Sequence, residues 1–382
     1  MAKNLSIVAQ GISGDEGHLL GYNVSDNGIY TPAIGDVVRG TTATYVAQDG
    51  LLKTAPPNVA RVDYTNGVAE LLLEPTSTNL VTYSNSNNLN FILDGVSLTY
   101  NSVQSPDGEQ NGITFEQVGS FESDSAYNYG SLPFSDGKYS YSFFIKAKDS
   151  TKFRILSDIG SAITQDFNPF DMQEGILQGS LNLKFESVSN GWFRVSFTRD
   201  LSSAPYNRFQ IYPDRNVNQQ GVYIYGIQVE QQSIPTAYIP TNGGTATRSS
   251  DSLTNFGSSQ IIDSSSGILF FEGIPSDGVV GLLNESDGSN SVFFQKGGTT
   301  ISGLVNNVRS LYFSGFSEGD VLKIVIKYNG TQYSLYVNGG LVDTKSITSM
   351  TNMNTLNFVY FLSSYSFYGR VRQVKHLPYN TD

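Results

Sequence analysis

The feature that most constrains the fold of this chain is the run at 190–198, NGWFRVSFT. The Asn-Gly pair at its start favours a tight turn, because both residues accept the left-handed backbone that such turns need. After it, Phe193, Val195 and Phe197 alternate with Trp192 and with polar residues, which is the period of two expected for a β-strand. The run therefore predicts a turn followed by a strand with one buried face.

The composition supports an all-β fold for the whole chain. Tyr and Phe each occur 23 times and Gly 38 times in 382 residues, whereas Met occurs 4 times. Aromatic residues fit pleated, half-buried surfaces, and glycine fits turns. A single core usually stops growing at about 250–300 residues, so this length predicts more than one domain. We expect an extended N-terminal region and two β-sandwich (jelly-roll) domains, with short helices at most.

Other strand patterns place these domains along the chain. Tyr139, Tyr141 and Phe143 alternate with serines, a β-rich strand at 222–230 follows, and 235–241 is an extended, proline-bounded exit. Asn-Gly turns at 329–330 and 338–339 separate strands at 321–328, 333–337 and 341–342, so they predict an antiparallel meander. The final strands are expected at 356–361 and 367–374.

A Gly/Ser/Thr-rich stretch that begins at Thr241 is almost free of aromatic residues, which is typical of a linker. We therefore predict four parts, which are an N-terminal region, a first sandwich, a linker and a second sandwich at residues 1–74, 75–245, 246–260 and 261–382.

Charge and cysteine content limit the classes of partner. The net charge is −11 and 15% of residues are charged, so the chain lacks the basic stripe that nucleic acid selects. With no cysteine, disulfides and thiolate metal sites are excluded. The N-terminal residues lack the apolar core of a signal peptide, and no apolar run approaches the roughly 20 residues that span a bilayer. We expect a protein made in a cytoplasm, without membrane insertion.

The sequence argues against an enzyme. Its two histidines, His18 and His376, cannot make a multi-histidine metal site. A carboxylate-based glycosidase could use Glu-x-Asp-x-x-Glu on one strand, but the starts at Glu122, Glu285 and Glu318 all lack the last acid. No catalytic residue is predicted, and polysaccharide cleavage is kept only as a less favoured alternative.

Sugar binding needs only exposed rings and hydrogen-bonding groups. Sugar rings stack on aromatic faces while amides and charged groups take the hydroxyls. The candidates are Trp192, Tyr206, Asn207, Arg208, Tyr212, Tyr127 and Tyr129. The alternative, which we favour for the tyrosines, is that they line strands whose other residues form the core. For Trp192, an exposed platform and an inter-domain plug are equally supported.

Calcium is the one cofactor that the sequence leaves open. Asp214, Asn216 and Asn218 recur at every second position, as ligands do in a calcium loop. The sixth position is Gln219 instead of Gly and the twelfth is Tyr225 instead of an acid, so an EF-hand is rejected. Asp107 is a further weak candidate, although solvated turn residues explain these acids better. We predict no required cofactor.

Residues 43–80 resemble a segment of bacteriophage tail proteins. An Ala-Pro-Asn-x-x-Arg core leads into Leu-Leu-Glu-Pro-x-x-Thr-Asn-Leu in that segment, and the matching residues here are Ala55, Pro57, Asn58, Arg61, Leu72, Leu73, Glu74, Pro75, Thr78, Asn79 and Leu80. Ser77 stands where an Arg is common in relatives, so the resemblance implies that any ion pair of that Arg is absent.

The rest of the chain resembles two further domain families. Residues 106–108, 139–148, 190–192 and 235–251 are similar to a carbohydrate-binding-module-like β-sandwich. Residues 327–330, 333–339 and 369–371 are similar to a concanavalin-like or laminin-G-like jelly roll.

The resemblance implies a virion structural protein that is commonly trimeric. It would be a tail fibre, head fibre or decoration protein that binds other virion proteins through its N-terminal region. Its lectin-like domains would contact host-surface polysaccharide. A purely architectural role without ligand stays open beside it.

Overall fold

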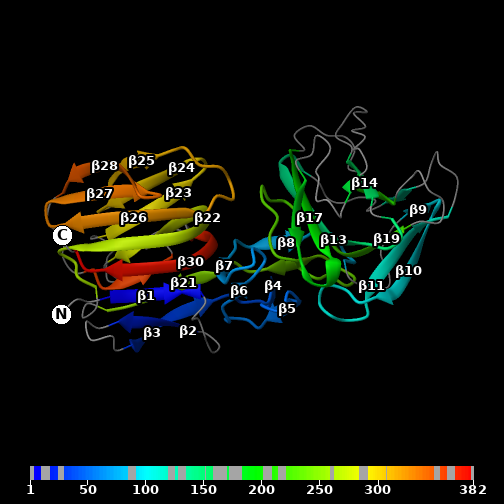
Figure 1. The fold of residues 1–382 in the computed structure, drawn as a ribbon, viewed down its shortest axis with the longest axis horizontal. Helices are drawn as coiled ribbons and strands as arrows, with labels where there is room; N and C mark the ends of the chain where they lie inside the picture. Colours follow the sequence, from blue (N-terminus) through cyan, green and yellow to red (C-terminus); the bar gives the residue numbers. More distant parts are fainter. Residues whose placement is uncertain are drawn as a thin grey trace. The chain divides into compact units, whose positions relative to one another are not determined.

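The computed structural model describes residues 4–9, 18–24, 30–84, 92–118, 125–127, 135–150, 152–157, 170–171, 183–200, 209–213, 221–258, 262–283, 291–306, 308–347, 353–358 and 366–379. These residues form β-strands and turns without an α-helix, which confirms the predicted all-β class (Figure 1). None of the described residues belongs to a helix long and apolar enough to cross a membrane.

The chain divides into two units that differ from the predicted parts. Unit 1 comprises residues 1–42, 55–76 and 249–382, and unit 2 comprises residues 43–54 and 77–248. Unit 2 is therefore built from two insertions into unit 1. The chain passes between the units four times, at residues 42/43, 54/55, 76/77 and 248/249.

Most strands of unit 1 belong to one continuous network of antiparallel pairs in the order β21-β3-β2-β1-β30-β22-β23-β24-β25, with β26 to β29, β6 and β7 branching from it. The bounds are β1 (Asn4–Val8), β2 (His18–Val24), β3 (Tyr30–Val38), β6 (Val62–Asp63), β7 (Glu70–Leu73), β21 (Ser252–Thr254), β22 (Gly267–Leu283), β23 (Ser291–Gly297), β24 (Thr300–Val305), β25 (Val308–Phe313), β26 (Leu322–Asn329), β27 (Gln332–Val337), β28 (Gly340–Ser346), β29 (Thr355–Asn357) and β30 (Tyr368–Leu377).

The long strand β22 connects the two layers of unit 1. Its first half pairs with β26 and β30, and its second half pairs with β23 and β29. Between the halves, Gly278 has φ of 91°, and a Cβ there would lie 2.0 Å from the Ser366 carbonyl oxygen. Glycine is therefore required where the strand changes partners.

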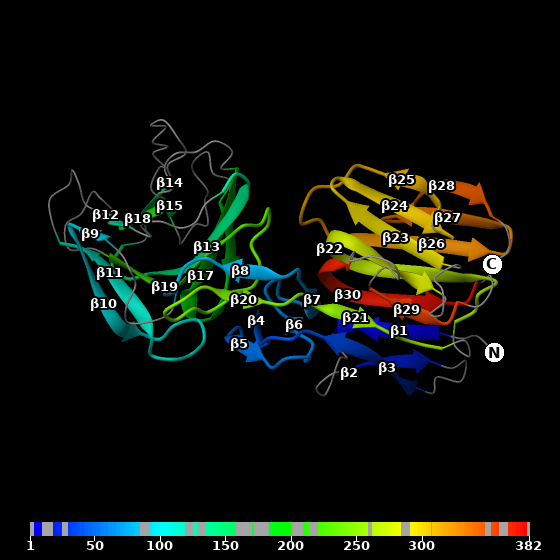
Figure 2. The same cartoon turned by 180° about the vertical axis from the view of Figure 1, so that it is seen from behind.

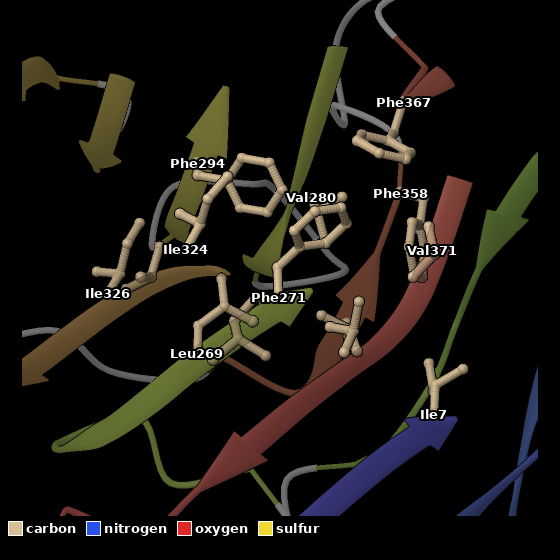
Figure 3. Packing of buried hydrophobic residues seen from close by; sticks show 14 of the residues in the cluster. Ile7, Leu269, Phe271, Val280, Phe294, Ile324, Ile326, Phe358, Phe367 and Val371 are labelled. Atoms are coloured by element: carbon tan, nitrogen blue, oxygen red, sulfur yellow. The ribbon is translucent and has the colours of Figure 1, made fainter. Parts of the chain in front are cut away.

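Apolar side chains from both layers meet in the core of unit 1 (Figure 3). The ring of Phe271 on β22 lies 4.8 Å from that of Phe294 on β23 and 5.5 Å from that of Phe367, centroid to centroid. Leu5, Ile7, Leu71 and Leu73 join the same core.

The predicted N-terminal region at residues 1–74 does not form a part of its own in the structure. β1 pairs with β30 from the C-terminal end of the chain, and β7 pairs with β30 as well. Alternating buried residues such as Leu5 and Ile7 explain this placement, because a strand with one apolar face needs a core to cover. The predicted linker at 246–260 also contains paired strands, β20 (Ala246–Arg248) and β21.

Unit 2 has two main sheets (Figure 2). One has the order β10-β11-β19-β13-β17-β16 and the other β15-β14-β18-β12-β9, while β20 pairs with β8 and β4 with β5. The bounds are β4 (Ala43–Val46), β5 (Leu52–Ala55), β8 (Ser77–Asn79), β9 (Ile92–Asp94), β10 (Val96–Val103), β11 (Gly112–Gln117), β12 (Ser125–Tyr127), β13 (Lys138–Ala147), β14 (Lys152–Ser157), β15 (Phe170–Asp171), β16 (Lys184–Ser187), β17 (Phe193–Asp200), β18 (Phe209–Pro213) and β19 (Gly221–Glu230).

Both faces of the six-stranded sheet are covered. Phe143 and Val195 point into the main core, which also receives Phe153 from the other sheet. On the opposite face, Phe144 and Trp192 pack in a second cluster with Leu52, Tyr225 and Tyr238. The predicted alternation is confirmed, but the second face is buried too.

A bulge at Gly226 changes which residues of β19 face the main core. Val222 and Ile224 point into the main core before it, whereas Ile227 and Val229 do so after it, so the inward parity changes. Gly226 has φ of 60°, and the pairing with β13 shifts register beside it. A single glycine inside a strand is the sequence sign of such a bulge.

The C-terminal meander follows the predicted turns. β26 pairs antiparallel with β27, and β27 with β28, across the turns at Asn329 and Asn338. Asn338 has φ of 51°, which the Asn-Gly pair tolerates.

Candidate functional site

The most distinctive polar centre of unit 1 is a buried ion cluster of Arg39, Arg61, Glu74 and Asp251. Arg61 Nη1 lies 2.7 Å from Glu74 Oε2, and Arg61 Nη2 lies 2.5 Å from Asp251 Oδ2. The other oxygen of Asp251 lies 2.9 Å from Arg39 Nη1. Both arginine side chains are 0% exposed. Two cations and two anions balance there, as burial requires.

Attraction within the cluster keeps Arg61 charged. Burial alone would lower the pKa of Arg61, but the charges of Asp251 and Glu74 outweigh burial and raise its pKa above its ordinary value.

The ion cluster and its neighbours connect the segments of unit 1 that lie next to the four passages between the units. Arg39 precedes the first passage, Glu74 precedes the third, and Asp251 follows the fourth. Arg39 also donates to the carbonyl oxygen of Pro56, just after the second passage, at 2.6 Å. Backbone amides of Ser249 and Ser250 donate to the hydroxyls of Thr41 and Thr76 at 3.0 and 3.1 Å. The cluster thus ties together segments that the insertions separate in sequence.

The segment at residues 43–80 supplies half of this cluster. Asn58 accepts a hydrogen bond from the Arg39 amide and donates its own amide to the Arg39 carbonyl, both at 2.9 Å. Its φ of 58° is a left-handed conformation that asparagine tolerates. The Leu72 amide donates to the Arg61 carbonyl at 2.9 Å, which aligns Arg61 with Glu74. The motif residues therefore have a structural role.

Arg39 and Asp251 were absent from the sequence predictions. Asp251 is separated from Arg61 by 190 residues and from Arg39 by 212. The available signal was Arg61 and Glu74, which lie on either side of the apolar run at 71–73. Their spacing could not identify Arg39 and Asp251 as partners, because these residues are far away in the sequence.

Ser77 contacts a buried carboxylate of unit 2. Glu230 is 0% exposed and accepts hydrogen bonds from Ser77 Oγ at 2.6 Å and from the Thr236 amide at 3.0 Å. The hydroxyls of Thr236 and Ser140 donate to it as well. Hydroxyl and amide donors therefore surround this carboxylate.

Side-chain amides hold the predicted extended exit at 235–241. Gln228 accepts from the Ile239 amide at 2.6 Å and donates to the Thr236 carbonyl at 3.2 Å. Asn79 donates to the Ile239 carbonyl at 2.8 Å. The backbone groups of this exit have no strand partners there. The side chains of Gln228 and Asn79 supply their hydrogen bonds instead.

Trp192 is buried within unit 2, which corrects its candidacy as an exposed sugar platform. Its side chain is 0% exposed, and its Nε1 donates to the Gln104 carbonyl at 3.0 Å. Leu52, from the short insertion at 43–54, packs in the same cluster. The ring has no free face for a sugar.

The other glycan candidates lie mostly outside the described residues. Tyr129, Tyr206, Asn207 and Arg208 are in this group. Tyr127 and Tyr212 lie on β12 and β18, which are paired neighbours in the five-stranded sheet. The structure therefore brings these two strands together.

Asp107 is saturated by protein donors. Its Oδ1 accepts from Ser105 Oγ at 2.5 Å and from the Glu109 amide at 2.9 Å, and its Oδ2 accepts from Tyr225 Oη at 2.7 Å and from Asn111 Nδ2 at 3.2 Å. Burial raises the pKa of Asp107, but these hydrogen bonds outweigh it and lower the pKa below 3.8. With two donors on each oxygen, the carboxylate is a turn-fixing group and a poor calcium ligand.

The other calcium candidates, Asp214, Asn216 and Asn218, lie outside the described residues. Within the described part of the chain, no group of three or more His, Asp or Glu side chains is arranged to hold a metal ion.

The second histidine of the chain is a buried core residue of unit 1. His376 is 0% exposed, and its Nε2 lies 3.1 Å from Tyr328 Oη, which donates to the Asp263 carbonyl at 2.7 Å. Its Nδ1 has no partner among the described residues. Burial lowers the pKa of His376 from 6.5 to about 4, although the negative charge of Asp263 opposes this.

We expect this histidine to make folding depend on pH. Between pH 6.5 and 4 the unfolded chain binds the proton and the folded chain does not, so stability is lost as pH falls through this window. The loss totals about 3 kcal/mol. Urea unfolding of the wild type and of His376→Gln from pH 7 to pH 4 measures it, and their difference should shrink as pH falls. A constant difference would contradict the expectation.

Comparisons with known proteins assign no family to the chain. No protein-family model matches the chain, and no curated protein matches it. Among solved structures, domains LG4-5 of the mouse laminin alpha1 chain align with 11% identity over 78% of this chain and 95% of that chain, with a TM-score of 0.26. Sucrose-6-phosphate hydrolase from Lactobacillus gasseri aligns with 12% identity over 97% of this chain and 78% of that chain, with a TM-score of 0.23. The likeness to the laminin domains is distant.

Proposed function

We propose that this chain is a non-enzymatic structural protein of a bacteriophage virion that presents lectin-like β-domains to host-surface glycans. It would be a tail fibre, head fibre or decoration protein and would act as a homotrimer bound to other virion proteins. Linked copies would raise the effective concentration of weak sugar sites, which suits attachment.

One observation carries the proposal. The residues by which the chain resembles tail proteins, including Asn58, Arg61 and Glu74, are members or direct supports of the buried ion cluster. The resemblance thus involves a built structural element that depends on several side chains at once. A match due to composition alone would not be expected to select mutually bonded residues.

A glycan array with the full chain tests the attachment role. We expect binding to one or a few surface glycans, and loss of that signal in the Tyr206→Ala, Tyr212→Ala double variant would locate the site in unit 2. Trp192→Phe is the matched aromatic control, because that ring is buried and should leave the array pattern unchanged. A blank array would favour the purely architectural role.

Polysaccharide cleavage is the rival activity. A depolymerase needs two carboxylates about 5–10 Å apart across a cleft. Incubation of host polysaccharide with the chain, followed by a reducing-end assay, separates the two roles. Release of reducing ends would overturn the non-enzymatic proposal.

A further inference from the structure

The outer face of the β27-β26-β22-β30 layer in unit 1 carries a basic and aromatic row. These four strands lie side by side in the layer (Figures 1 and 2). Val325 on β26 lies opposite Phe270 on one side and Tyr336 on the other, and Phe270 lies opposite Lys375. We call this the basic sheet face, with Lys323, Val325, Lys327, Phe270, Tyr336 and Lys375 as its members.

The burial pattern shows that this face is open. Along β26 the even-numbered residues Leu322, Ile324 and Ile326 are buried, while Lys323 is exposed and Val325 and Lys327 are partly exposed. Phe270, Tyr336 and Lys375 are partly exposed as well. Apolar surface and three ammonium groups therefore share one side of the sheet.

Two of the three lysines of this face are free to pair with an anion. Lys323 and Lys375 form no ion pair among the described residues, and Lys327 Nζ lies 4.3 Å from the ring centroid of Tyr379. The carboxylate on this face is Glu272, opposite Lys323, and it accepts a hydrogen bond from Gln373 at 2.6 Å. The face is thus net positive on a chain whose net charge is −11.

We infer that the basic sheet face binds an anionic, carboxylate-bearing polysaccharide, an inference that rests on the proposed attachment function and names its ligand class. Ammonium groups would pair with the carboxylates, and the Tyr336 and Phe270 rings would pack on the C–H faces of the sugars. Lysines flanking Val325 lie about 7 Å from it along the strand, so they suit charges repeated along an extended polymer.

Other occupants fit less well. Lysine is depleted in the cores of protein interfaces, which argues against a second copy of the chain on this face. Nucleic acid is also a polyanion, so the net charge of −11 does not separate it from an acidic polysaccharide, and single-stranded DNA bound as tightly as polygalacturonate would contradict the inference. Binding of a charged polymer would use both kinds of group on this face. The lysines would make the binding sensitive to salt, and the partly exposed rings would pack on the sugars.

Polygalacturonate is the probe for the test, with dextran as the neutral control. The wild-type chain should bind polygalacturonate, more weakly as salt is added, and Lys323→Gln combined with Lys375→Gln should raise Kd about tenfold. Lys345→Gln is the matched control, because it removes one charge from the same unit at a position opposite the buried Tyr333. It should leave Kd unchanged.

Several results would overturn the inference. They are no polygalacturonate binding, equal loss in the Lys345→Gln control, or self-association in sedimentation that the double variant abolishes. If the array shows neutral glycans bound while polygalacturonate is ignored, the ligand class fails and the attachment role stands. If no glycan binds at all, the attachment role itself fails.

Discussion

Replacing Arg61 with alanine is expected to destabilise unit 1 by about 3–5 kcal/mol, because it leaves two buried carboxylates without their shared cation. Glu74 Oε2 and Asp251 Oδ2 lie 2.7 and 2.5 Å from the guanidinium that the substitution removes. Urea unfolding followed by circular dichroism measures the loss. Trp192, the one tryptophan of the chain, lies in unit 2, so its fluorescence in the same samples reports on that unit.

Two variants sharpen this prediction. Lys345→Ala removes an exposed ion pair with Asp343 whose side chains are 47% and 50% exposed, so its cost should be far smaller than that of Arg61→Ala. Arg61→Lys keeps the charge but loses the forked geometry, so it should fall between the two. An Arg61→Ala variant as stable as Lys345→Ala would show that the ion cluster contributes little to folding.

Replacing Trp192 with alanine should destabilise unit 2 by about 3–5 kcal/mol through the cavity that it leaves. The indole fills the space between Phe144, Tyr225 and Leu52 on the outer face of the six-stranded sheet. Because the variant has no tryptophan, the unfolding curve is followed by circular dichroism.

Trp192→Phe separates packing from the hydrogen bond. It keeps an aromatic ring but leaves the Gln104 carbonyl without the Nε1 donor, at a cost of about 1–3 kcal/mol. If Trp192→Ala instead lost glycan binding without losing stability, Trp192 would act as a sugar platform and its burial in the structure would be contradicted.

Local patterns were enough to predict the strands. The alternation at 193–197 and the Asn-Gly turns at 329–330 and 338–339 correspond to strands and turns of the structure. Period-two alternation and left-handed turn residues act over a few positions, so a single sequence carries them.

The interleaved units could not be predicted in the same way. Ser140, Ser142 and Gln228 suggest a solvent face, yet all three are buried, and Gln228 donates to the Thr236 carbonyl of the exit at 235–241. In a sequence, a polar residue that hydrogen-bonds the backbone of a covering segment cannot be told from a polar residue that is exposed to solvent. The pairing of β1 with β30 likewise depends on contacts between the two ends of the chain.

The candidate sites show the same limit. Arg61 and Glu74 were recognised through a resemblance, whereas Arg39 and Asp251 became visible only through the folded chain. Trp192 was correctly placed on the face opposite Phe193, but its covering by Leu52 depends on a short insertion far away in sequence.

Quantitative mass spectrometry of purified phage particles, from cells that produce this chain, tests the proposed virion role most directly. We predict that the chain remains with the particles through purification, in a copy number that is a multiple of three relative to the other structural proteins. Its presence in the lysate together with its absence from the particles would contradict the proposal.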